Sequence, residues 1–301
     1  MNLEALAACL GSASCAVTQV STGLIVGMLL FLVTSGLSLI FGVLGVINFA
    51  HGALYMLGAY FAFAAYTLTG SFVAALMAGA IGVGLVGVLF ERLIMSRVYG
   101  HDLLMQLLVC YAAILILDDV VKIAFGSDYR MMGMPEAFAV APFEVAGGFI
   151  PAYYLFMLAT SFAVGLVLWL GINRTRLGKI VRALAINPAM VGALGINTKL
   201  LYAGVFGVGS LLAGLAGALA APTRTLTPGM GVSILIESFI VTVIGGMGSI
   251  AGAFIAALLI GFTRAFGAIG FPLFVDGMMF AIMALVLILK PSGLLGREAA
   301  T

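Results

Sequence analysis

Charged side chains are what this sequence has least of. Asp, Glu, Lys and Arg make up only 8% of its 301 residues, whereas soluble domains carry about 25%. Hydrophobic residues account for 64%, and the mean hydropathy is +1.28. These values exclude a water-soluble fold, and the formal net charge of +2 gives no reason to expect nucleic-acid binding.

Residues that build catalytic and metal centres are also scarce. The two histidines, His51 and His101, lie far apart, and no His, Asp or Glu cluster has the spacing of metal ligands. The three cysteines form no CxxC pair, so we expect no metal site. Cys9 and Cys15 can pair if the N-terminus faces an oxidising compartment, but two free thiols are the favoured interpretation. A membrane-bound enzyme with a cofactor is therefore not expected.

Long apolar runs are abundant instead. A transmembrane β-barrel would show short alternating segments, so these runs predict helices and an all-α polytopic membrane protein. We predict a bundle of about nine transmembrane segments (range 8–10) in a single transmembrane domain over 1–301. The expected spans lie near 20–44, 50–68, 72–92, 103–125, 150–172, 198–221, 233–246, 250–268 and 272–290. The seventh is short, so it is also compatible with half of a discontinuous helix.

The distribution of basic residues predicts which loops face the cytoplasm. Segment 126–149 has more acidic than basic residues and is expected to be the largest external loop. With nine crossings, residues 1–19 form an external N-terminal segment, and the C-terminus is cytoplasmic. Three segments are then cytoplasmic: the loop with Arg92 and Arg97, the basic segment 173–199, and the tail 291–301. Lys290 directly precedes this tail, and Arg297 lies within it.

A polar break interrupts the apolar stretch 36–60. Membrane-embedded chain tolerates such a break only where protein covers the backbone or where the break lines a wet cavity. Asn48 and His51 either line a translocation path or hydrogen-bond the backbone of the bend, and both can hold. Because the break lies toward the cytoplasmic ends of the first two spans, we favour a hinge or inner gate over a selective site. The candidate residues here are Asn48, Phe49, His51, Gly52 and Tyr55.

A second glycine-rich break follows the seventh span and forms a loose repeat of the first. Paired broken helices indicate a transporter binding region. Glu237, at the start of this span, can meet a substrate ammonium or a basic residue of a binding protein; simple interfacial placement is the alternative. In the fourth span, Asp118 and Lys122 are four residues apart and can pair on one helix face. Ionisable residues inside a span are functional candidates, but snorkelling toward the outer end of the span is the favoured interpretation. The candidates of the second break are Glu237, Gly245, Gly246, Gly248 and Ser249.

The basic segment contains a predicted amphipathic helix from Arg182 to Leu194, whose latter part begins at Pro188. Gly195 is a suitable C-terminal cap. Such a helix can lie on lipid headgroups or dock into a groove on a soluble partner. Its apolar stripe consists of Ala183, Ile186, Met190 and Leu194.

Four strings, in this order, resemble motifs of the branched-chain amino acid ABC-importer permeases of the LivH type. They are GVLGVINFAHGALYMLGAY, RALAINPAMVGALGIN, VIGGMGSIAGAFIAALLIG and KPSGLLG. The resemblance implies a type II importer bundle in the bacterial inner membrane, without a catalytic centre of its own. This agrees with the absence of a G-x-x-x-x-G-K-[ST] phosphate loop.

The resemblance also implies partners: a homologous LivM-type permease, two cytoplasmic ATPases of the LivG and LivF types, and a periplasmic solute-binding protein. It favours docking of the coupling segment 173–197 into an ATPase, through Arg182, Ala183, Asn187, Pro188, Gly195, Ile196 and Asn197. The implied substrates are branched-chain or other hydrophobic amino acids. Urea, short amides or another small organic solute remain alternatives, and so does a self-sufficient channel or secondary carrier.

Overall fold

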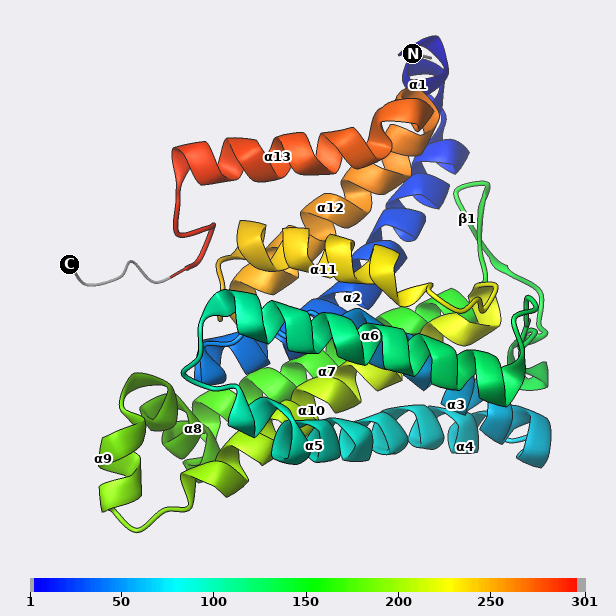
Figure 1. Ribbon diagram of the computed structural model, residues 1–301. Helices are drawn as coiled ribbons and strands as arrows, with labels where there is room; N and C mark the ends of the chain where they lie inside the picture. The colour runs from blue at the N-terminus through cyan, green and yellow to red at the C-terminus, as the bar shows by residue number, and fades with distance from the viewer. Residues whose placement is uncertain (1–2, 297–301) are drawn as a thin grey trace.

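The computed structural model describes residues 3–296 as a bundle of helices with one small β-hairpin (Figure 1). The predicted tail 291–301 is described up to Gly296, and residues 297–301 lie outside the described residues. The strands β1 (Phe143–Val145) and β2 (Gly148–Ile150) pair antiparallel. The helices are α1 (Leu3–Leu10), α2 (Ala13–Leu44), α3 (His51–Thr69), α4 (Phe72–Met77), α5 (Val83–Leu93), α6 (Leu103–Phe125), α7 (Ala152–Arg174), α8 (Arg176–Ile186), α9 (Pro188–Ala193), α10 (Thr198–Ala220), α11 (Gly231–Gly245), α12 (Ile250–Gly270) and α13 (Val275–Leu289).

Short helical turns complete the chain. A π-helical turn joins α4 to α5, so that these two helices form one span. Four single 3-10 turns lie at the ends of longer helices or in loops. The π turn is Ala78–Gly82, and the 3-10 turns are Met95–Arg97, Glu136–Phe138, Ala221–Thr223 and Pro272–Phe274.

Every predicted span coincides with a helix, and the all-α membrane fold is confirmed. Among the described residues, seven helical segments are long and apolar enough to cross a membrane. The other two predicted spans are α6 and α11. At 1.5 Å per residue, the 15-residue α11 is about 22 Å long, which is shorter than the hydrocarbon core of about 30 Å. The expected short seventh segment is therefore a partial span.

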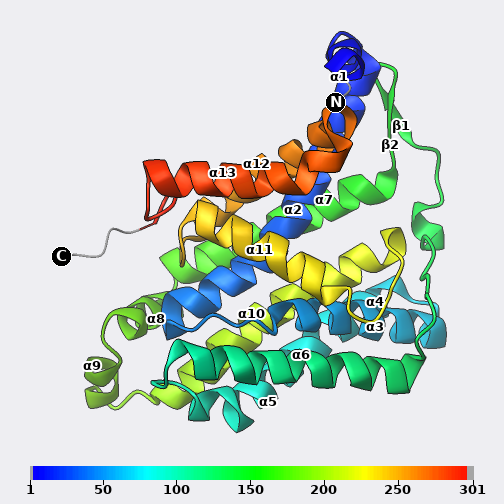
Figure 2. The same ribbon diagram turned by 45° about the horizontal axis from the view of Figure 1, so that its top comes forward.

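The helix ends gather on two opposite sides of the bundle. In Figure 1, α8, α9 and the C-terminal end lie at the left, and the β1–β2 hairpin lies at the right. Figure 2 shows the same separation after a 45° turn. The basic segments and the acidic loop therefore lie on opposite sides, as the sequence predicts.

Helices α2 and α10 form the centre of the bundle. α2 packs against α12, α10 and α7, while α10 packs against α3 and α5. Glycines permit the closest approaches: a Cβ on Gly58 of α3 would lie only 2.4 Å from the backbone of Gly214 in α10. Such contacts between small residues are typical of helix packing in membranes.

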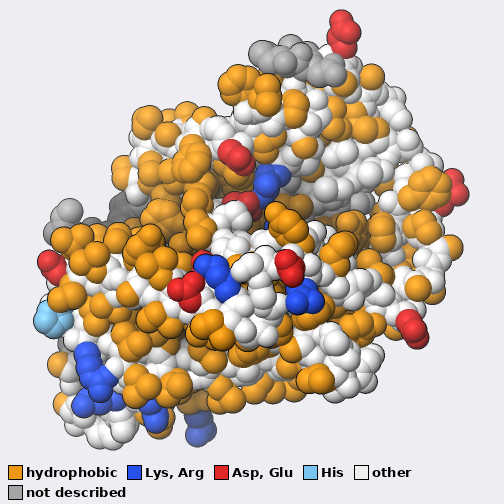
Figure 3. All heavy atoms as spheres, turned by 45° about the vertical axis from the view of Figure 1, so that its right-hand side comes forward, with side chains coloured by type: hydrophobic (Ala, Val, Ile, Leu, Met, Phe, Trp, Pro, Cys, Tyr) orange, Lys and Arg blue, Asp and Glu red, His pale blue; other side chains and the backbone are white. Residues whose placement is uncertain are grey.

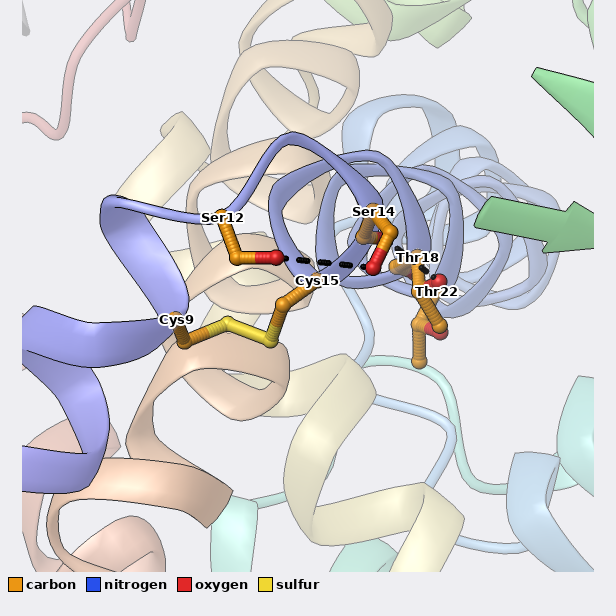
Figure 4. Close-up of a disulfide and its surroundings, with 6 residues drawn as sticks. All are labelled: Cys9, Ser12, Ser14, Cys15, Thr18 and Thr22. Atoms are coloured by element: carbon orange, nitrogen blue, oxygen red, sulfur yellow. Dashed lines mark hydrogen bonds between the residues drawn. A yellow bond between two sulfur atoms is a disulfide. The ribbon is translucent and has the colours of Figure 1, made fainter. Parts of the chain in front are cut away.

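The N-terminal cysteines differ from the favoured prediction, because Cys9 and Cys15 form a disulfide (Figure 4). The bond joins α1 to the first turn of α2, and Ser12 is the residue that directly precedes α2. Sequence reasoning could not decide this pairing, because it depends on the sharp reversal of the chain between the two helices. Cys110, in α6, is buried and unbonded to another cysteine.

The charged pair in α6 is not the one that the four-residue spacing allows. Lys122 pairs with Asp119, three residues away, at 3.0 Å and not with Asp118. Asp118 instead faces the turn that precedes α11, where its Oδ2 lies 3.8 Å from a Cβ placed on Gly229. Lys122 can reach a partner three or four residues away on its helix. Because Asp118 faces the turn before α11, Asp119 is the carboxylate that pairs with Lys122.

The predicted coupling helix is two helices, which corrects the single helix expected from Arg182 to Leu194. α8 ends at Ile186, and α9 begins at Pro188 as predicted. Proline disfavours helical backbone in the residue before it, and Asn187 accordingly has φ −148°. The Asn187 Oδ1 accepts a hydrogen bond from the Met190 backbone N–H at 3.0 Å and so caps α9.

Candidate translocation and coupling site

The first polar break turns back into the bundle after α2 ends. Gly45 has φ +68° and closes α2 in a left-handed conformation, which glycine adopts without strain. The chain then runs beside α2, so that the His51 Nε2 lies 3.0 Å from the carbonyl oxygen of Val33. Val33 precedes Leu44 by about three helical turns, roughly 16 Å along the axis. His51 therefore lies well inside the bundle.

Asn48 is fully buried beside α6. Its Oδ1 accepts a hydrogen bond from the Ala50 N–H at 3.1 Å and lies 3.9 Å from the Cys110 Sγ. Asn48 thus satisfies a backbone group at the bend, as one of the two predicted roles requires, whereas the His51 ring contacts a carbonyl oxygen inside α2. The other role, in a path or gate, stays a prediction. The neighbouring Phe49 ring packs against Phe239 of α11 at a centroid distance of 6.1 Å.

The start of α3 meets the start of α11 in the middle of the bundle. A Cβ on Gly52 would lie 2.1 Å from the Gly231 carbonyl oxygen, and a Cβ on Gly231 would lie 2.4 Å from that of Gly52. Tyr55, one turn later in α3, is buried. Sequence reasoning missed this second internal helix start, because it looked for the paired break after α11. The signal was Pro222 together with Gly229, which flank a polar run before the seventh span.

A buried ion pair joins α11 to α12. Arg264 of α12 donates from Nη1 to the Glu237 Oε1, while the Glu237 Oε2 has no partner. Glu237 thus lies in the second turn of α11 with its side chain 11% exposed, and that of Arg264 is 31% exposed. Figure 3 shows acidic and basic side chains next to one another within a largely hydrophobic face.

Arg264 was not among the predicted site residues. It is the single charged residue in the sequence of α12, IAGAFIAALLIGFTRAFGAIG. Ionisable residues inside a span are functional candidates by default, so this signal was present in the sequence. What the sequence lacked was the identity of the partner, because Glu237 is on a different helix.

The second glycine break packs against the end of the described chain. Gly246 and Gly248 have φ +97° and +87°, and the Ser249 Oγ accepts from the Gly252 N–H at 3.0 Å to cap α12. The N–H groups of Leu294 and Leu295 donate to the carbonyl oxygens of Ile244 and Gly245, at 2.8 and 3.0 Å. The VIGGMGS and KPSGLLG motifs therefore form one structure.

The coupling segment lies close to this structure across a cavity of about 370 Å³. Arg182 of α8, Gly42 of α2 and Gly248 with Ser249 line it. It brings together one coupling residue and two residues of the second break. Asn48, His51 and Glu237 do not line this cavity. The predicted site residues therefore form two groups: an internal group, with Asn48, His51 and Glu237, and a second group near α8, with Arg182, Gly248 and Ser249.

The two coupling helices expose an apolar surface. Leu184 and Val191 are buried and attach α8 and α9 to the bundle, whereas Ile186, Met190 and Leu194 are 76%, 63% and 74% exposed. The predicted stripe therefore points away from this chain. Arg182 donates a hydrogen bond to the carbonyl oxygen of Ile172 at the end of α7.

The end of the coupling segment leads directly into a central helix. Gly195 has φ +79° and ends α9 as predicted. The Asn197 Oδ1 then accepts from the Leu200 N–H at 3.1 Å and caps α10. Ala183 is exposed and Ile196 is half-buried. A displacement of α9 therefore acts on the first turn of α10 through only a few residues.

A family model described as "Branched-chain amino acid transport system / permease component" matches residues 19–288. The chain belongs to this family. Over 292 residues it is 33% identical to the high-affinity branched-chain amino acid transport system permease protein BraD of Pseudomonas aeruginosa, covering 93% of this chain and 95% of BraD. Over 294 residues it is 31% identical to LivH of Escherichia coli K12, with the same coverage.

A more distant relative and a solved structure extend the comparison. The probable branched-chain amino acid transport permease protein LivH of Methanocaldococcus jannaschii is 28% identical over 288 residues, 89% of each chain. PsaBC from Streptococcus pneumoniae, solved in complex with Fab, matches with a TM-score of 0.52 over 96% of this chain and 95% of that one. The identity of 11% means that this match shows the fold alone.

The family match confirms the expected resemblance. This permease is a multi-pass protein of the inner membrane and a permease subunit of an ABC importer. All of the internal group, the α8–α9 surface and the second glycine break lie within the matched residues 19–288. The KPSGLLG segment, which binds that break, starts just after them.

Proposed function

We propose that this permease moves branched-chain or other hydrophobic amino acids inward by alternating access. The names of BraD and LivH support this substrate class. The observation that carries the proposal within the chain is the Glu237–Arg264 pair. A free amino acid presents an ammonium and a carboxylate, and the pair presents one group complementary to each.

The pair also indicates which face of the bundle borders the path. Charged groups inside a membrane are costly unless they face other protein or a water-filled cavity. The Arg264 side chain is 31% exposed at the surface of the chain. We therefore assign this face to the path wall, opposite a second, homologous permease subunit of the LivM type.

A transport mechanism follows from the two groups of site residues. ATP binding and hydrolysis by cytoplasmic LivG- and LivF-type subunits move α8 and α9, whose exposed apolar stripe docks on them. Arg182 carries the motion to α7 through Ile172. Asn48 and His51, held at the bend before α3, act as a hinge or inner gate. Phe49, Gly52 and Tyr55 form its packed surroundings.

The sidedness of the permease follows the same proposal. The basic segments and the C-terminus face the cytoplasm, and the N-terminus faces the periplasm, where a solute-binding protein delivers the substrate. The Cys9–Cys15 disulfide supports this orientation, because disulfides persist in oxidising compartments and are rare in the cytoplasm.

Uptake by the reconstituted importer tests the substrate class. The complex with its permease partner, ATPases and binding protein is placed in liposomes and supplied with radiolabelled leucine or urea. We expect ATP-dependent leucine uptake, and a fall of about tenfold or more for Glu237→Gln or Arg264→Gln, because each loses a charge-assisted contact. Asp119→Asn, in the exposed pair of α6, is the matched control and should transport normally.

The outcomes separate the rival functions. Uptake of urea or a short amide, with no leucine uptake, would reject the zwitterion proposal within the same importer class. Uptake that persists without the ATPase subunits would indicate a self-sufficient channel or secondary carrier. Substitution of Asn48 or His51 should change the rate of uptake more than the preference among solutes, and a clean change in preference would contradict the gate role.

A further inference from the structure

A basic cleft lies between the end of α5 and the start of α10, next to the coupling helices. It has a volume of about 720 Å³ and is formed by the end of α5, the following 3-10 turn and the start of α10. Three cationic side chains line it: Arg92, Arg97 and Lys199. Lys and Arg side chains gather at the lower left of Figure 3, below hydrophobic surface, at this end of the molecule.

The lining of the cleft has a positive net charge, because three cations face one carboxylate. Of the two salt bridges between described residues, neither involves Arg92, Arg97 or Lys199. The one carboxylate in the lining, Glu91, is 2% exposed and accepts a hydrogen bond from the Tyr99 hydroxyl at 3.2 Å. Two causes raise the pKa of Tyr99: burial, which is the larger, and then the negative charge of the neighbouring Glu91. The Tyr99 hydroxyl therefore keeps the proton that it donates to Glu91. The cations therefore remain available to an anion.

An apolar stripe continues from the cleft along α10. Leu200 lines the cleft and is 58% exposed, and Val208 is 43% exposed two turns further on. Gly204 lies between them on the same helix face, and a Cβ placed there would contact nothing within 4 Å. The stripe is therefore open, apolar and long enough for part of an acyl chain. A ligand that suits this surface has an anionic group for the basic cleft and an alkyl chain for the apolar stripe. A phospholipid has this chemistry.

We propose that the Arg92–Arg97–Lys199 cleft binds the phosphate headgroup of an anionic phospholipid, with an acyl chain along Leu200, Gly204 and Val208. Basic pockets between transmembrane helices on the cytoplasmic side are suited to such headgroups. The proposal goes beyond the transport function, because the cleft includes none of the residues assigned to the path or to ATPase docking except Asn197. An occupied cleft would hold the end of α5 against the start of α10, directly after the coupling helices.

Lipid retention by the assembled importer tests the proposal. The detergent-purified complex is incubated with equal amounts of phosphatidylglycerol and phosphatidylethanolamine, and native mass spectrometry counts the lipids bound to each complex. We expect a preference of about tenfold or more for phosphatidylglycerol, since each cation near an anionic lipid contributes substantially. Arg97→Gln with Lys199→Gln should remove the preference. Arg174→Gln with Arg176→Gln, on the same side but outside the cleft, is the control and should keep it.

Two further arms decide the source of the phosphate and the identity of the occupant. Addition of inorganic phosphate alone should leave lipid retention unchanged; complete displacement of the lipid by it would overturn the lipid assignment in favour of a soluble phosphate compound. An absent preference in the unmodified complex, or an unchanged one in the cleft variant, would overturn the proposal. So would loss of the ATPase subunits from the cleft variant with lipid retention intact, because the cleft would then be part of the ATPase interface.

Discussion

Glu237 of α11 and Arg264 of α12 form an ion pair although 27 residues separate them in the chain. Each is the single charged residue in the sequence of its helix. The two helices are joined by the glycine break at Gly245–Ser249, which lets them pack side by side. The pair therefore fixes the relative register of two helices that the proposed path needs on one wall.

Removal of one partner from this pair should destabilise the permease. Arg264→Ala leaves the mostly buried Glu237 carboxylate without its cation, and we expect a loss of about 1–3 kcal/mol; this is less than for a fully buried pair, because Arg264 is partly exposed. The thermal midpoint of the detergent-purified complex measures it. Lys122→Ala breaks the exposed pair with Asp119 and should lower the thermal midpoint much less, because exposed ion pairs contribute little to stability. Equal losses for both variants would contradict this prediction.

The contact between the starts of α3 and α11 should not tolerate a side chain. Gly52→Ala or Gly231→Ala would place a methyl group 2.1 or 2.4 Å from a backbone oxygen of the other helix, which is overpacking that costs about 1–3 kcal/mol or more. We expect a large loss of folded protein by fluorescence size-exclusion chromatography. Gly277→Ala, where a Cβ contacts nothing within 4 Å, is the control and should fold normally.

Polar substitution of the exposed coupling surface should weaken ATPase association without affecting the fold. Met190 and Leu194 are mostly exposed, so Met190→Ser with Leu194→Ser removes no packing within this chain. We expect less ATPase subunit in affinity pull-downs and lower solute-stimulated ATP hydrolysis. Met131→Ser, at an exposed position on the opposite side, should change neither. Unimpaired association would show that α9 lies on lipid headgroups instead.

Arg182 and Pro188 test coupling separately from docking. Arg182→Ala removes the hydrogen bond to Ile172, and Pro188→Ala removes the proline that sets the start of α9. We expect reduced solute-stimulated ATPase activity and uptake with the ATPase subunits still bound. If both activities stayed at the level of the unmodified complex, the coupling role of this segment would fail.

The N-terminal disulfide gives a direct test of sidedness. In intact cells, a membrane-impermeant maleimide–polyethylene glycol reagent should add nothing until an impermeant reductant opens the Cys9–Cys15 bond, and should then add two labels. Cys110 is buried and should stay unlabelled. Labelling that requires permeabilised cells would place the N-terminus in the cytoplasm.

The positions of the helices were predictable because their signals are local. Runs of apolar residues mark the spans, Pro188 marks the start of α9, and Gly195 and Asn197 mark the turn into α10. Each of these signals depends only on the residue itself and on its neighbours within one helical turn. The separation of basic and acidic segments on opposite sides follows in the same way from the order of the spans.

The pairing of residues across helices was not predictable, because it depends on packing between segments distant in the chain. Asp119, not Asp118, pairs with Lys122 because Asp118 faces the turn before α11. The pairing of Arg264 with Glu237 was not predictable, because only the fold brings the two residues together, although a lone arginine inside a span was a signal in the sequence.

The sequence by itself thus determined the membrane bundle, its family and the basic segment 173–199, since hydropathy and capping act over short distances. Only the tertiary structure decided that Gly52 meets Gly231 inside the bundle and that Glu237 pairs with Arg264. Close packing of small residues and the cost of an unpaired charge in the membrane select those partners among many that the sequence allows.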